Sequence, residues 1–431
     1  MSGVRIYNDE LRNLGMTLPG FIERGKVIAS LPSLGILTLA GHTPDGWEID
    51  YLEIDALTDE TMGSACSQAH DLVAISCLTA RIYDAYRLSD QLRHQGKTVM
   101  IGGLHASVLP DEVALHANVV VVGEGEAVWG EILSDYLASN LKPRYTANRE
   151  PAFTPWAVPR YDLLDPDKYN RITIQTTRGC PLDCSFCAAS RMISGYKRKS
   201  IHQVEQELDA IEAIWPRPFI ELADDNTFVH KKWSRQLVEA IGKRRAKWFT
   251  ESDISLADDE MLLKDLAASG CVQVLIGLEA TEESALDETD SKHWKRKRRS
   301  QYVDAIQKIQ DHGVSVNGCF IFGFDTHTPD VFESTARFIE DANLAEVQLT
   351  ILTPFPGTEL HRKLESEGRL LAKTFWDKCT LFDVAYQPKQ MSPDQLTSGF
   401  RDLVKEVYSP TNTDRRKARF RECVRKAKTH V

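Results

Sequence analysis

The sequence contains no apolar run that approaches the roughly 20 residues of a membrane-spanning helix. Its first residues, Met1-Ser2-Gly3-Val4-Arg5, lack the apolar centre of a signal peptide. Nine cysteines occur, but their spacing matches no disulfide framework. We therefore expect no transmembrane segment, and we predict that the protein works in the reducing cytoplasm.

The chain also lacks the Ser, His and Asp pattern of a nucleophilic triad, so the sequence assigns no catalytic acid or base. What it contains is ordinary for a globular protein, with 42% hydrophobic and 26% charged residues over 431 positions. This length is enough for two or three domains with their own cores.

Charge is distributed unevenly around a net value of −10. Residues 292–299 contain six Lys or Arg and no acid, and residues 414–431 contain eight Lys or Arg against two acids. Such segments bind phosphates, nucleic acid or anionic lipid, but more often they are solvated faces. We favour solvated faces and expect no nucleic-acid partner. A second hypothesis is that 292–299 faces an anionic substrate.

Three closely spaced cysteines form the most informative motif, Cys180-Pro-Leu-Asp-Cys184-Ser-Phe-Cys187. An electron-transfer cluster with four irons usually takes four thiolates. A group of three leaves one iron open to a small molecule, which favours chemistry over electron storage. A zinc knuckle is the alternative, but it would need a fourth ligand nearby, and the next candidate, His202, lies fifteen residues on.

The cysteine loop follows a predicted strand. Residues 171–177 alternate β-branched and polar side chains, and Gly179 and Pro181 suit a sharp turn after them. The loop is therefore expected at the carboxyl end of a strand, where α/β proteins bind their ligands.

With Phe186 directly before the last cysteine, this motif resembles the signature of the radical S-adenosylmethionine (SAM) superfamily. The resemblance implies a [4Fe-4S] cluster held by Cys180, Cys184 and Cys187, with SAM on the open iron and Phe186 near it. It also implies an electron donor such as flavodoxin or ferredoxin, and reductive cleavage of SAM to a 5′-deoxyadenosyl radical.

Residues 1–140 alternate predicted strands and helices. Strands are expected at Val4–Tyr7, Trp47–Ile54, Leu72–Cys77, Thr98–Ile101 and Val119–Val122, and helices from Leu34–Ala40 and over Ala85–His94. Buried apolar strands separated by helices predict a doubly wound parallel sheet.

Glycine pairs follow two of these strands, at Gly102-Gly103 and Gly123-Glu124-Gly125. Glycine there lets a ligand approach the carboxyl edge of the sheet. With Leu31–Gly35 and Ile75–Thr79, these turns resemble the cobalamin-binding domain that precedes many radical SAM cores. The resemblance implies cobalamin contacts from Ser76, Thr79, Gly102, Gly103, His105, Gly123, Glu124 and Gly125.

One departure concerns the lower cobalt ligand. Many cobalamin domains carry Asp-x-His-x-x-Gly, but here Gly41-His42-Thr43-Pro44-Asp45-Gly46 has neither the Asp nor the spacing. We therefore predict that His42 is a surface loop residue and that cobalamin binds without it. Alternatively, the domain has lost cobalamin and kept only its fold.

Four segments are predicted: a cobalamin-binding-like domain at 1–140, a proline-rich linker at 141–170, a partial (β/α)6 barrel at 171–355, and a small helical extension with a basic tail at 356–431. Six strands support the barrel, at Ile172–Thr176, Phe219–Leu222, Trp248–Thr250, Val272–Ile276, Val314–Phe322 and Val347–Leu352. The cysteine loop and residues after the other strands should share the carboxyl mouth.

Resemblance to the superfamily implies SAM contacts around this mouth. They are Asp224 or Asp225, Glu251, Ser252, Gly277, Glu279 and Gly318. Two adjacent acids are not expected to point inward together, so we favour one of Asp224 and Asp225. For Asp253 we prefer capping of the helix that holds Met261 and Leu262. Cys271 and Cys319 are expected in the core.

Thr353–Thr358, Phe375-Trp376-Asp377 and Gln387–Ser392 resemble the branch of this superfamily that includes hopanoid and other carbon methylases. We therefore predict cobalamin-dependent methylation of an unactivated carbon in a small-molecule or lipid substrate. Two alternatives are a radical cyclisation, rearrangement or ring contraction without methyl transfer, and a non-catalytic cofactor sensor.

Overall fold

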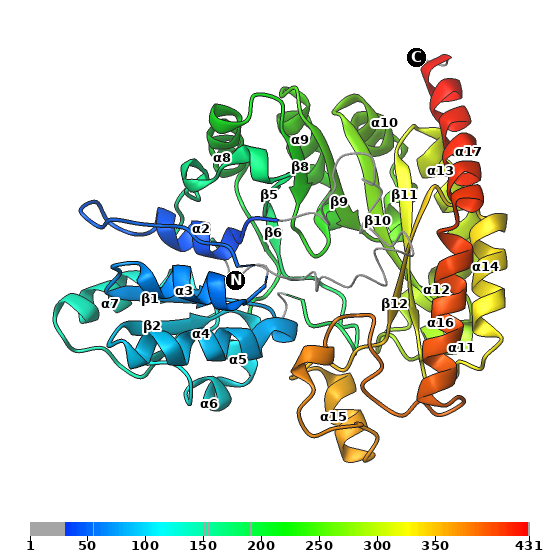
Figure 1. Ribbon diagram of the computed structural model, residues 1–431. Helices are drawn as coiled ribbons and strands as arrows, with labels where there is room; N and C mark the ends of the chain where they lie inside the picture. Colours follow the sequence, from blue (N-terminus) through cyan, green and yellow to red (C-terminus); the bar gives the residue numbers. More distant parts are fainter. Residues whose placement is uncertain (1–30, 55, 150–151, 154, 190–191, 430–431) are drawn as a thin grey trace.

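The computed structural model describes residues 31–54, 56–149, 152–153, 155–189 and 192–429. In this part, two parallel sheets lie side by side, the N-terminal one next to the end of the larger sheet that carries the cysteine loop (Figure 1). The strand predicted at Val4–Tyr7 lies outside the described residues.

The N-terminal sheet has four parallel strands in sequence order. They are β1 (Leu72–Ser76), β2 (Thr98–Gly102), β3 (Val119–Val122) and β4 (Arg144–Thr146). The first three were predicted, whereas β4 falls in the range assigned to the linker. The accompanying helices are α2 (Leu34–Gly41), α3 (Asp59–Ser67), η2 (Thr79–Arg81), α4 (Ile82–His94), α5 (Leu104–Val108), α6 (Pro110–Val113) and α7 (Gly125–Leu137).

Alternate residues of this sheet enter two cores. Val99 and Ile101 belong to one apolar cluster, and Met100, between them, belongs to another. Successive side chains of a strand point to opposite faces, so both faces of the sheet are buried under helices. This explains why its strands read as continuous apolar runs.

The strand predicted at Trp47–Ile54 is wrong, because this segment pairs with no strand in the described residues. Its alternating pattern has another cause. The Trp47 ring lies 5.9 Å from that of Tyr136, and the Tyr51 hydroxyl accepts a hydrogen bond of 2.6 Å from the Ser33 backbone amide. One side of an extended segment is thus buried without a ladder.

The larger sheet has six parallel strands in the order β12-β11-β10-β9-β8-β5, as predicted for a partial barrel. They are β5 (Ile172–Ile174), β8 (Phe219–Leu222), β9 (Lys247–Ser252), β10 (Cys271–Glu279), β11 (Ser315–Phe322) and β12 (Glu346–Ile351). A separate antiparallel ribbon joins β6 (Thr177–Arg178) to β7 (Lys197–Arg198).

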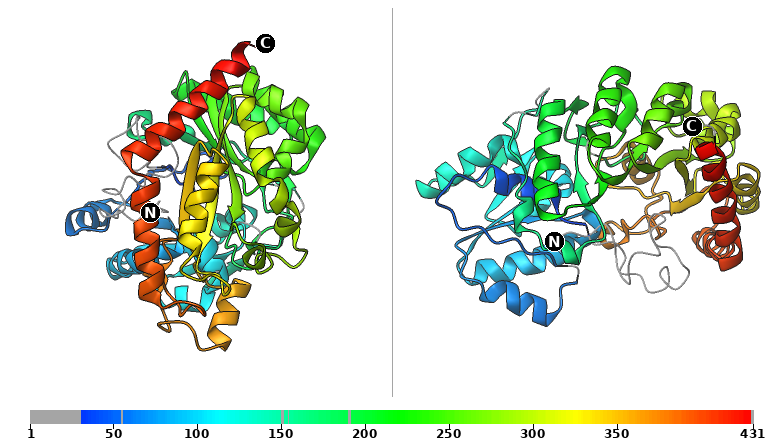
Figure 2. Two further views of the ribbon diagram at one scale, coloured as in Figure 1. Left: turned by 90° about the vertical axis from the view of Figure 1, so that its right-hand side faces the viewer. Right: turned by 90° about the horizontal axis from the view of Figure 1, so that it is seen from above.

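Helices cover the outer side of this curved sheet (Figure 2). They are α8 (Ile201–Ile214), α9 (Lys231–Gly242), α10 (Glu260–Ala268), α13 (Tyr302–Asp311) and α14 (Val331–Asp341), with the short α11 (Glu283–Leu286) and α12 (Trp294–Arg298). Short 3-10 helices lie before β5 at η3 (Tyr161–Leu163) and η4 (Pro166–Lys168), after β8 at η6 (Thr227–Val229), after β9 at η7 (Ile254–Asp258), before α13 at η8 (Arg299–Gln301) and in the C-terminal extension at η9 (Trp376–Lys378).

The C-terminal extension forms α15 (Glu359–Ser366), α16 (Pro393–Val407) and α17 (Pro410–Thr429). α16 contacts the edge strand β12 and α14, and α17 contacts α13 (Figure 1). Covering an edge strand protects it from pairing with other chains.

The basic tail is largely α17, and part of its charge is used within the fold. Arg415 and Arg419 contact Glu340, and buried Arg416 donates to the Val407 carbonyl. No helix in the described residues combines the length and apolar character needed to cross a bilayer.

The Tyr386 hydroxyl ties the extension to the end of β11 by donating a 2.5 Å hydrogen bond to the buried Gly323 carbonyl. Tyr386→Phe should lower the free energy of unfolding by about 1–2 kcal/mol, because that carbonyl loses its donor in a dry environment. Urea unfolding measures this change. Tyr83→Phe, at a 37% exposed position, is the control and should leave stability within error.

Candidate active site

The cysteine loop begins at the end of β6 and is held by two acids that follow β8. Asp224 accepts hydrogen bonds from the backbone amides of Thr176, at 2.6 Å, and Thr177, at 2.8 Å, and Asp225 accepts one of 2.9 Å from Gly179. Both carboxylates therefore reach the same loop, and which of the two contacts SAM stays a prediction. Both fix the backbone that leads to the first cysteine.

Gly179 is required by its backbone. Its φ is +81°, and an added Cβ would lie 2.7 Å from the Gly195 carbonyl oxygen in the turn before β7. A side chain at this position would push the β6–β7 ribbon apart.

The other side of the loop rests on segments from later in the chain. Ser185 donates its amide to the Thr289 carbonyl at 2.8 Å and its hydroxyl to the Glu288 carbonyl at 3.0 Å. The Phe186 ring packs edge-on against Phe324 with centroids 6.1 Å apart. Phe186 thus anchors the loop, and its proposed contact with SAM stays a prediction.

The donor set fits an iron–sulfur cluster. Cys184 is buried, Cys180 and Cys187 are partly exposed, and none forms a disulfide. Burial, opposed by the nearby Lys295, raises the pKa of Cys184 to about 12, so metal binding must displace thiol protons. No group of three or more His, Cys, Asp or Glu in the described residues is placed to hold a single ion. Cluster thiolates each bind a separate iron, so a wider spacing suits them.

Glu251 and Glu279 stand at the mouth of the barrel. Glu279 has φ +65° and accepts a 2.6 Å hydrogen bond from Lys295, which also donates to the Gly277 carbonyl at 2.7 Å. Solvent reaches the Glu251 side chain at the mouth, but the groups that surround it closely limit its hydration. Its loss of hydration, followed by repulsion from the carboxylates of Glu221, Asp225, Asp224 and Glu279, raises its pKa to about 8.

The other predicted SAM residues are placed differently. Asp253 caps η7 by accepting from the Ser255 amide at 2.8 Å, so the prediction that it caps the helix with Met261 and Leu262 is wrong; Asp259 caps that helix. The Ser252 hydroxyl makes only a long 3.4 Å contact, to the Asp253 carbonyl. At Gly318, an added Cβ would lie within about 3 Å of Leu344 and Leu278, so close packing alone requires a glycine there.

The basic run 292–299 does not present a row of free charges. Lys295 is buried and turned toward Glu279, while Arg296 pairs with Asp287 at 3.0 Å and Arg298 with Asp258 at 2.8 Å. These pairs are partly exposed, so the hypothesis that the segment 292–299 faces an anionic substrate stays a prediction.

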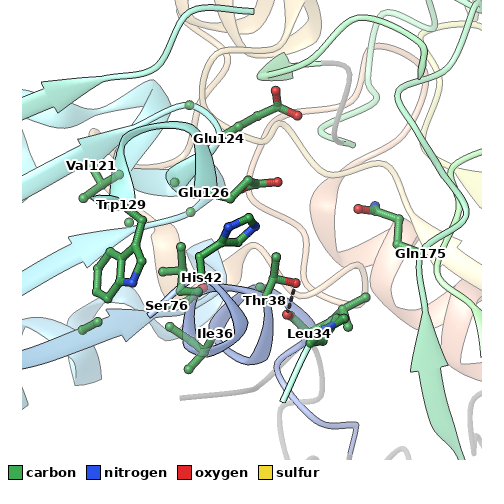
Figure 3. Close-up of a pocket in the computed structure, with 18 of the residues that line it drawn as sticks. Leu34, Ile36, Thr38, His42, Ser76, Val121, Glu124, Glu126, Trp129 and Gln175 are labelled. Atoms are coloured by element: carbon green, nitrogen blue, oxygen red, sulfur yellow. Dashed lines mark hydrogen bonds between the residues drawn. The ribbon is translucent and has the colours of Figure 1, made fainter. Parts of the chain in front are cut away.

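A cavity of about 300 Å³ opens at the carboxyl edge of the N-terminal sheet and faces the barrel (Figure 3). Six of the predicted cobalamin residues line it: Ser76, Gly102, Gly103, Gly123, Glu124 and Gly125. Gln175, Arg178 and Ala223 contribute from the barrel side. Glycines at this edge of a parallel sheet let a ligand approach the backbone closely, and the edge of such a sheet is where cofactors bind.

His42 also lines this cavity, so its placement on a surface loop was wrong (Figure 3). It is partly buried at the end of α2, and burial lowers its pKa. Thr79 and His105 are not part of this cavity. They lie 3.3 Å apart in a separate apolar cavity, and His105 packs edge-on against Trp376 of the extension.

A buried ion cluster connects the two sheets. Arg178, two residues before Cys180, donates to Glu124 at 2.6 Å and to Glu126 at 2.5 Å, and Lys197 donates to Glu124 at 2.6 Å. The Phe153 ring lies 5.0 Å from both cations. Burial opposes the charge on Glu126, but Arg178 outweighs it and lowers the pKa of Glu126. Sequence analysis missed Arg178, Lys197 and Phe153.

Comparison with known families assigns three regions. Residues 24–133 match the B12 binding domain, residues 174–339 match the radical SAM superfamily, and residues 358–431 match a domain of unknown function (DUF4070). The predicted fold class, superfamily and cofactor set of [4Fe-4S], SAM and cobalamin are therefore confirmed at the level of domains.

Two curated proteins resemble nearly the whole chain. The bacteriochlorophyllide d C-12(1)-methyltransferase of Chlorobaculum tepidum is 28% identical over 395 residues, which cover 90% of this chain and 84% of that protein. The anaerobic magnesium-protoporphyrin IX monomethyl ester cyclase of Rubrivivax gelatinosus is 25% identical over 433 residues, which cover 91% and 75%.

Among solved structures, the radical S-adenosylmethionine methyltransferase TsrM from Kitasatospora setae, with cobalamin and a [4Fe-4S] cluster bound, superposes with a TM-score of 0.69. The match covers 90% of this chain and 88% of TsrM at 14% sequence identity, so it establishes a shared fold.

The ion cluster yields a stability prediction. Arg178→Gln should lower the free energy of unfolding by about 3–5 kcal/mol, because it leaves Glu126 without its cation and Glu124 with Lys197 alone. A double-mutant cycle with Glu126→Gln should give a coupling of about 1–3 kcal/mol by urea unfolding. The exposed pair Arg144–Asp111 is the control, and its cycle should give less than about 1 kcal/mol. A near-zero coupling for Arg178 and Glu126 would show that the cluster does not join the units.

Glu251 yields a pH prediction for the cofactor-free chain. Its folded pKa of about 8 exceeds the unfolded value of about 4.3, so the folded state binds the proton more tightly. Stability should fall as pH rises between these values. Glu251→Gln should therefore become more stable than the parent as pH increases toward 8, and the gain should shrink toward pH 4.5. Thermal unfolding across this range tests it, with Glu48→Gln controlling for the loss of one exposed charge.

Proposed function

We propose that this chain, which belongs to the radical SAM superfamily and carries a B12 binding domain, is a cobalamin-dependent methyltransferase. The proposed acceptor is an unactivated carbon of a small-molecule or lipid substrate. When bound, the cluster supplies the electron that cleaves SAM reductively, and cobalamin supplies a methyl carrier.

The observation that carries this proposal is the junction between the two units. Arg178 lies in the strand that leads to Cys180, and it is bonded to Glu124 in a turn that lines the cavity of the N-terminal sheet. One ion cluster thus holds the cysteine loop and the glycine-rich edge next to each other. A reaction that uses both cofactors requires that proximity.

The chain's own residues bind, orient and enclose. Cys180, Cys184 and Cys187 would hold the cluster, and Asp224 and Asp225 fix the loop that presents them. Glu251, Ser252, Gly277 and Glu279 surround the place proposed for SAM, with Phe186 and Gly318 supporting it. Cobalamin would bind in the cavity lined by Ser76, Gly102, Gly103, Gly123, Glu124 and Gly125. Thr79 and His105, the other two predicted contacts, line the neighbouring cavity, which shares Leu104 with it.

A non-methylating radical reaction is the second candidate. It is supported by the cyclase of Rubrivivax gelatinosus, to which this chain is similar over 91% of its length. We favour methyl transfer, because the C-12(1)-methyltransferase is 28% identical to this chain and the match covers 84% of that protein. The corresponding values for the cyclase are 25% and 75%. A non-catalytic sensor has no supporting observation here.

We further propose that the protein works in the cytoplasm and receives electrons from a small donor such as flavodoxin or ferredoxin. The structure gives none of the nine cysteines a disulfide partner among the described residues, which suits a reducing compartment. The partly exposed Cys180 and Cys187 suit electron delivery from outside.

The proposal is tested with anaerobically reconstituted protein. It should bind about four irons and one cobalamin per chain, and it should release 5′-deoxyadenosine from SAM with a chemical reductant. An extract of the producing cells incubated with methyl-labelled SAM should gain a labelled product. Deoxyadenosine without cobalamin uptake or label would favour the second candidate.

Cys184→Ala should lose iron and reduce deoxyadenosine to the level without protein, because one cluster ligand is missing. Cys423→Ala, in α17 on the outer helical layer, is the matched control and should retain both. Iron analysis and chromatography of the nucleoside give the two readouts. Full activity in Cys184→Ala would overturn the proposed function.

A further inference from the structure

The second cavity, of about 190 Å³, lies where three parts of the chain meet. Leu104 and Val108 line it from the N-terminal unit, Met192 from the segment after the cysteine loop, and Phe355, Cys379 and Leu381 from the segments after β12. We call this cavity the apolar chamber.

The apolar chamber adjoins both proposed cofactor sites. Ala188, which follows the cluster cysteine Cys187 directly, lines it. Leu104 lines both the apolar chamber and the cavity at the edge of the N-terminal sheet. A group inside it would be close to both sites at once.

Its lining carries no charge at neutral pH. No Asp, Glu, Lys or Arg contributes to it. Burial raises the pKa of Cys379 to about 12 and lowers that of His105, so both remain neutral. The hydroxyl of Thr380 donates to Asp383 at 2.7 Å, and Thr79 contacts His105 at 3.3 Å. A charged ligand group would therefore be buried without a counter-charge, which is costly.

One wall is strained. Leu381 has φ +71°, a conformation that a bulky side chain rarely adopts. The turn is fixed on both sides: Ile351 donates its amide to the Leu381 carbonyl at 2.7 Å, and the amides of Phe382 and Asp383 donate to the Thr380 hydroxyl at 3.0 and 3.1 Å. Strain held in this way concentrates at functional sites.

The walls are also held together firmly. At Gly357, an added Cβ would lie 2.4 Å from Val108 and 2.9 Å from Met192, so three segments are in close contact there. Trp376 donates to both oxygens of Glu112 at 3.0 Å, which fastens the extension to the N-terminal unit. The apolar chamber is therefore a preformed site and not a gap between loosely joined parts.

We propose that the apolar chamber receives an uncharged hydrocarbon portion of the substrate and that Leu381 limits its width. Its volume is comparable to the roughly 150 Å³ of an apolar cavity that takes up benzene. One or two fused rings, or a short branched chain, would fit. This inference rests on the proposed function, because it is the two cofactors that make the position productive.

The first experiment compares two probes that differ in charge. On the full chain reconstituted with the cluster and without cobalamin, the uncharged two-ring dye 2-methoxynaphthalene should bind with a change in its fluorescence, and its sulfonated analogue 6-methoxynaphthalene-2-sulfonate should bind at least tenfold more weakly. Met192→Trp, which fills the chamber, should weaken the uncharged dye at least tenfold. Leu115→Trp, at a 72% exposed position, should not.

The second experiment tests the width. Leu381→Gly removes the side chain at a backbone angle that glycine accepts. It should admit the four-ring probe pyrene, with binding at least tenfold tighter than in the parent. Ser139→Gly relaxes another positive φ, of 54°, at an exposed position and should leave pyrene binding unchanged.

Three results would overturn the inference: equal binding of the two dyes, unchanged dye binding in Met192→Trp, or stoichiometric displacement of the dye by cobalamin. The last would assign the chamber to the cofactor. Deoxyadenosine formation, measured on the same preparation, reports separately on the proposed function. If the chain forms deoxyadenosine but fails the dye tests, only the inference about the chamber is overturned. If it passes the dye tests without forming deoxyadenosine, the proposed function is overturned.

Discussion

The structure depends on fixing the backbone of the cysteine loop as firmly as that of a helix or strand. Three cysteines presented by a loop bind a cluster only if the loop backbone is fixed before the metal arrives, because flexible ligands lose entropy on binding. The chain meets this need with two consecutive acids, Asp224 and Asp225, whose carboxylates accept hydrogen bonds from the backbone at 176, 177 and 179. Burial raises the pKa of Asp224 to about 6 despite these donors.

The second constraint is the relation between the two parallel sheets. Each sheet alone offers a carboxyl edge, and neither edge is enclosed by its own sheet. The cluster of Arg178, Lys197, Glu124 and Glu126 joins them at one point, and the C-terminal extension joins them at another through Trp376 and Glu112. Between these two points lie both cavities, so water exclusion is a property of the assembled chain.

The sequence was informative where a single local signal was enough. Apolar runs identified β1, β2 and β3, apolar or alternating segments identified all six barrel strands, and spacing identified the cysteine loop. It failed at Trp47–Ile54, because one-sided burial of an extended segment produces the same alternation as a strand. It failed for Asp253 because η7 intervenes before the helix that was expected to follow.

The missed site residues needed distant partners. Arg178 and Glu124 are 54 positions apart, and no local pattern announces their contact. Lys295 was hidden in a basic run in which Arg296 and Arg298 pair with acids at the surface. One signal was available in the sequence: Arg178 is a charged residue next to a cluster motif. If such a residue is buried, it needs a counter-charge. The prediction for His42 was wrong because the missing Asp-x-His-x-x-Gly pattern bears only on cobalt ligation. It does not indicate whether the side chain is buried.

The ion cluster has a consequence for how such proteins can recombine. Arg178 belongs to the unit that carries the cysteine loop. The carboxylates it pairs with, Glu124 and Glu126, belong to the N-terminal unit. If the N-terminal unit were replaced by one with neutral residues at these two positions, the Arg178 guanidinium would be buried without a counter-charge next to the cysteine loop. The two units of this chain are therefore complementary in charge at their junction, and a chimaera should fold only when it keeps both the acids and the base.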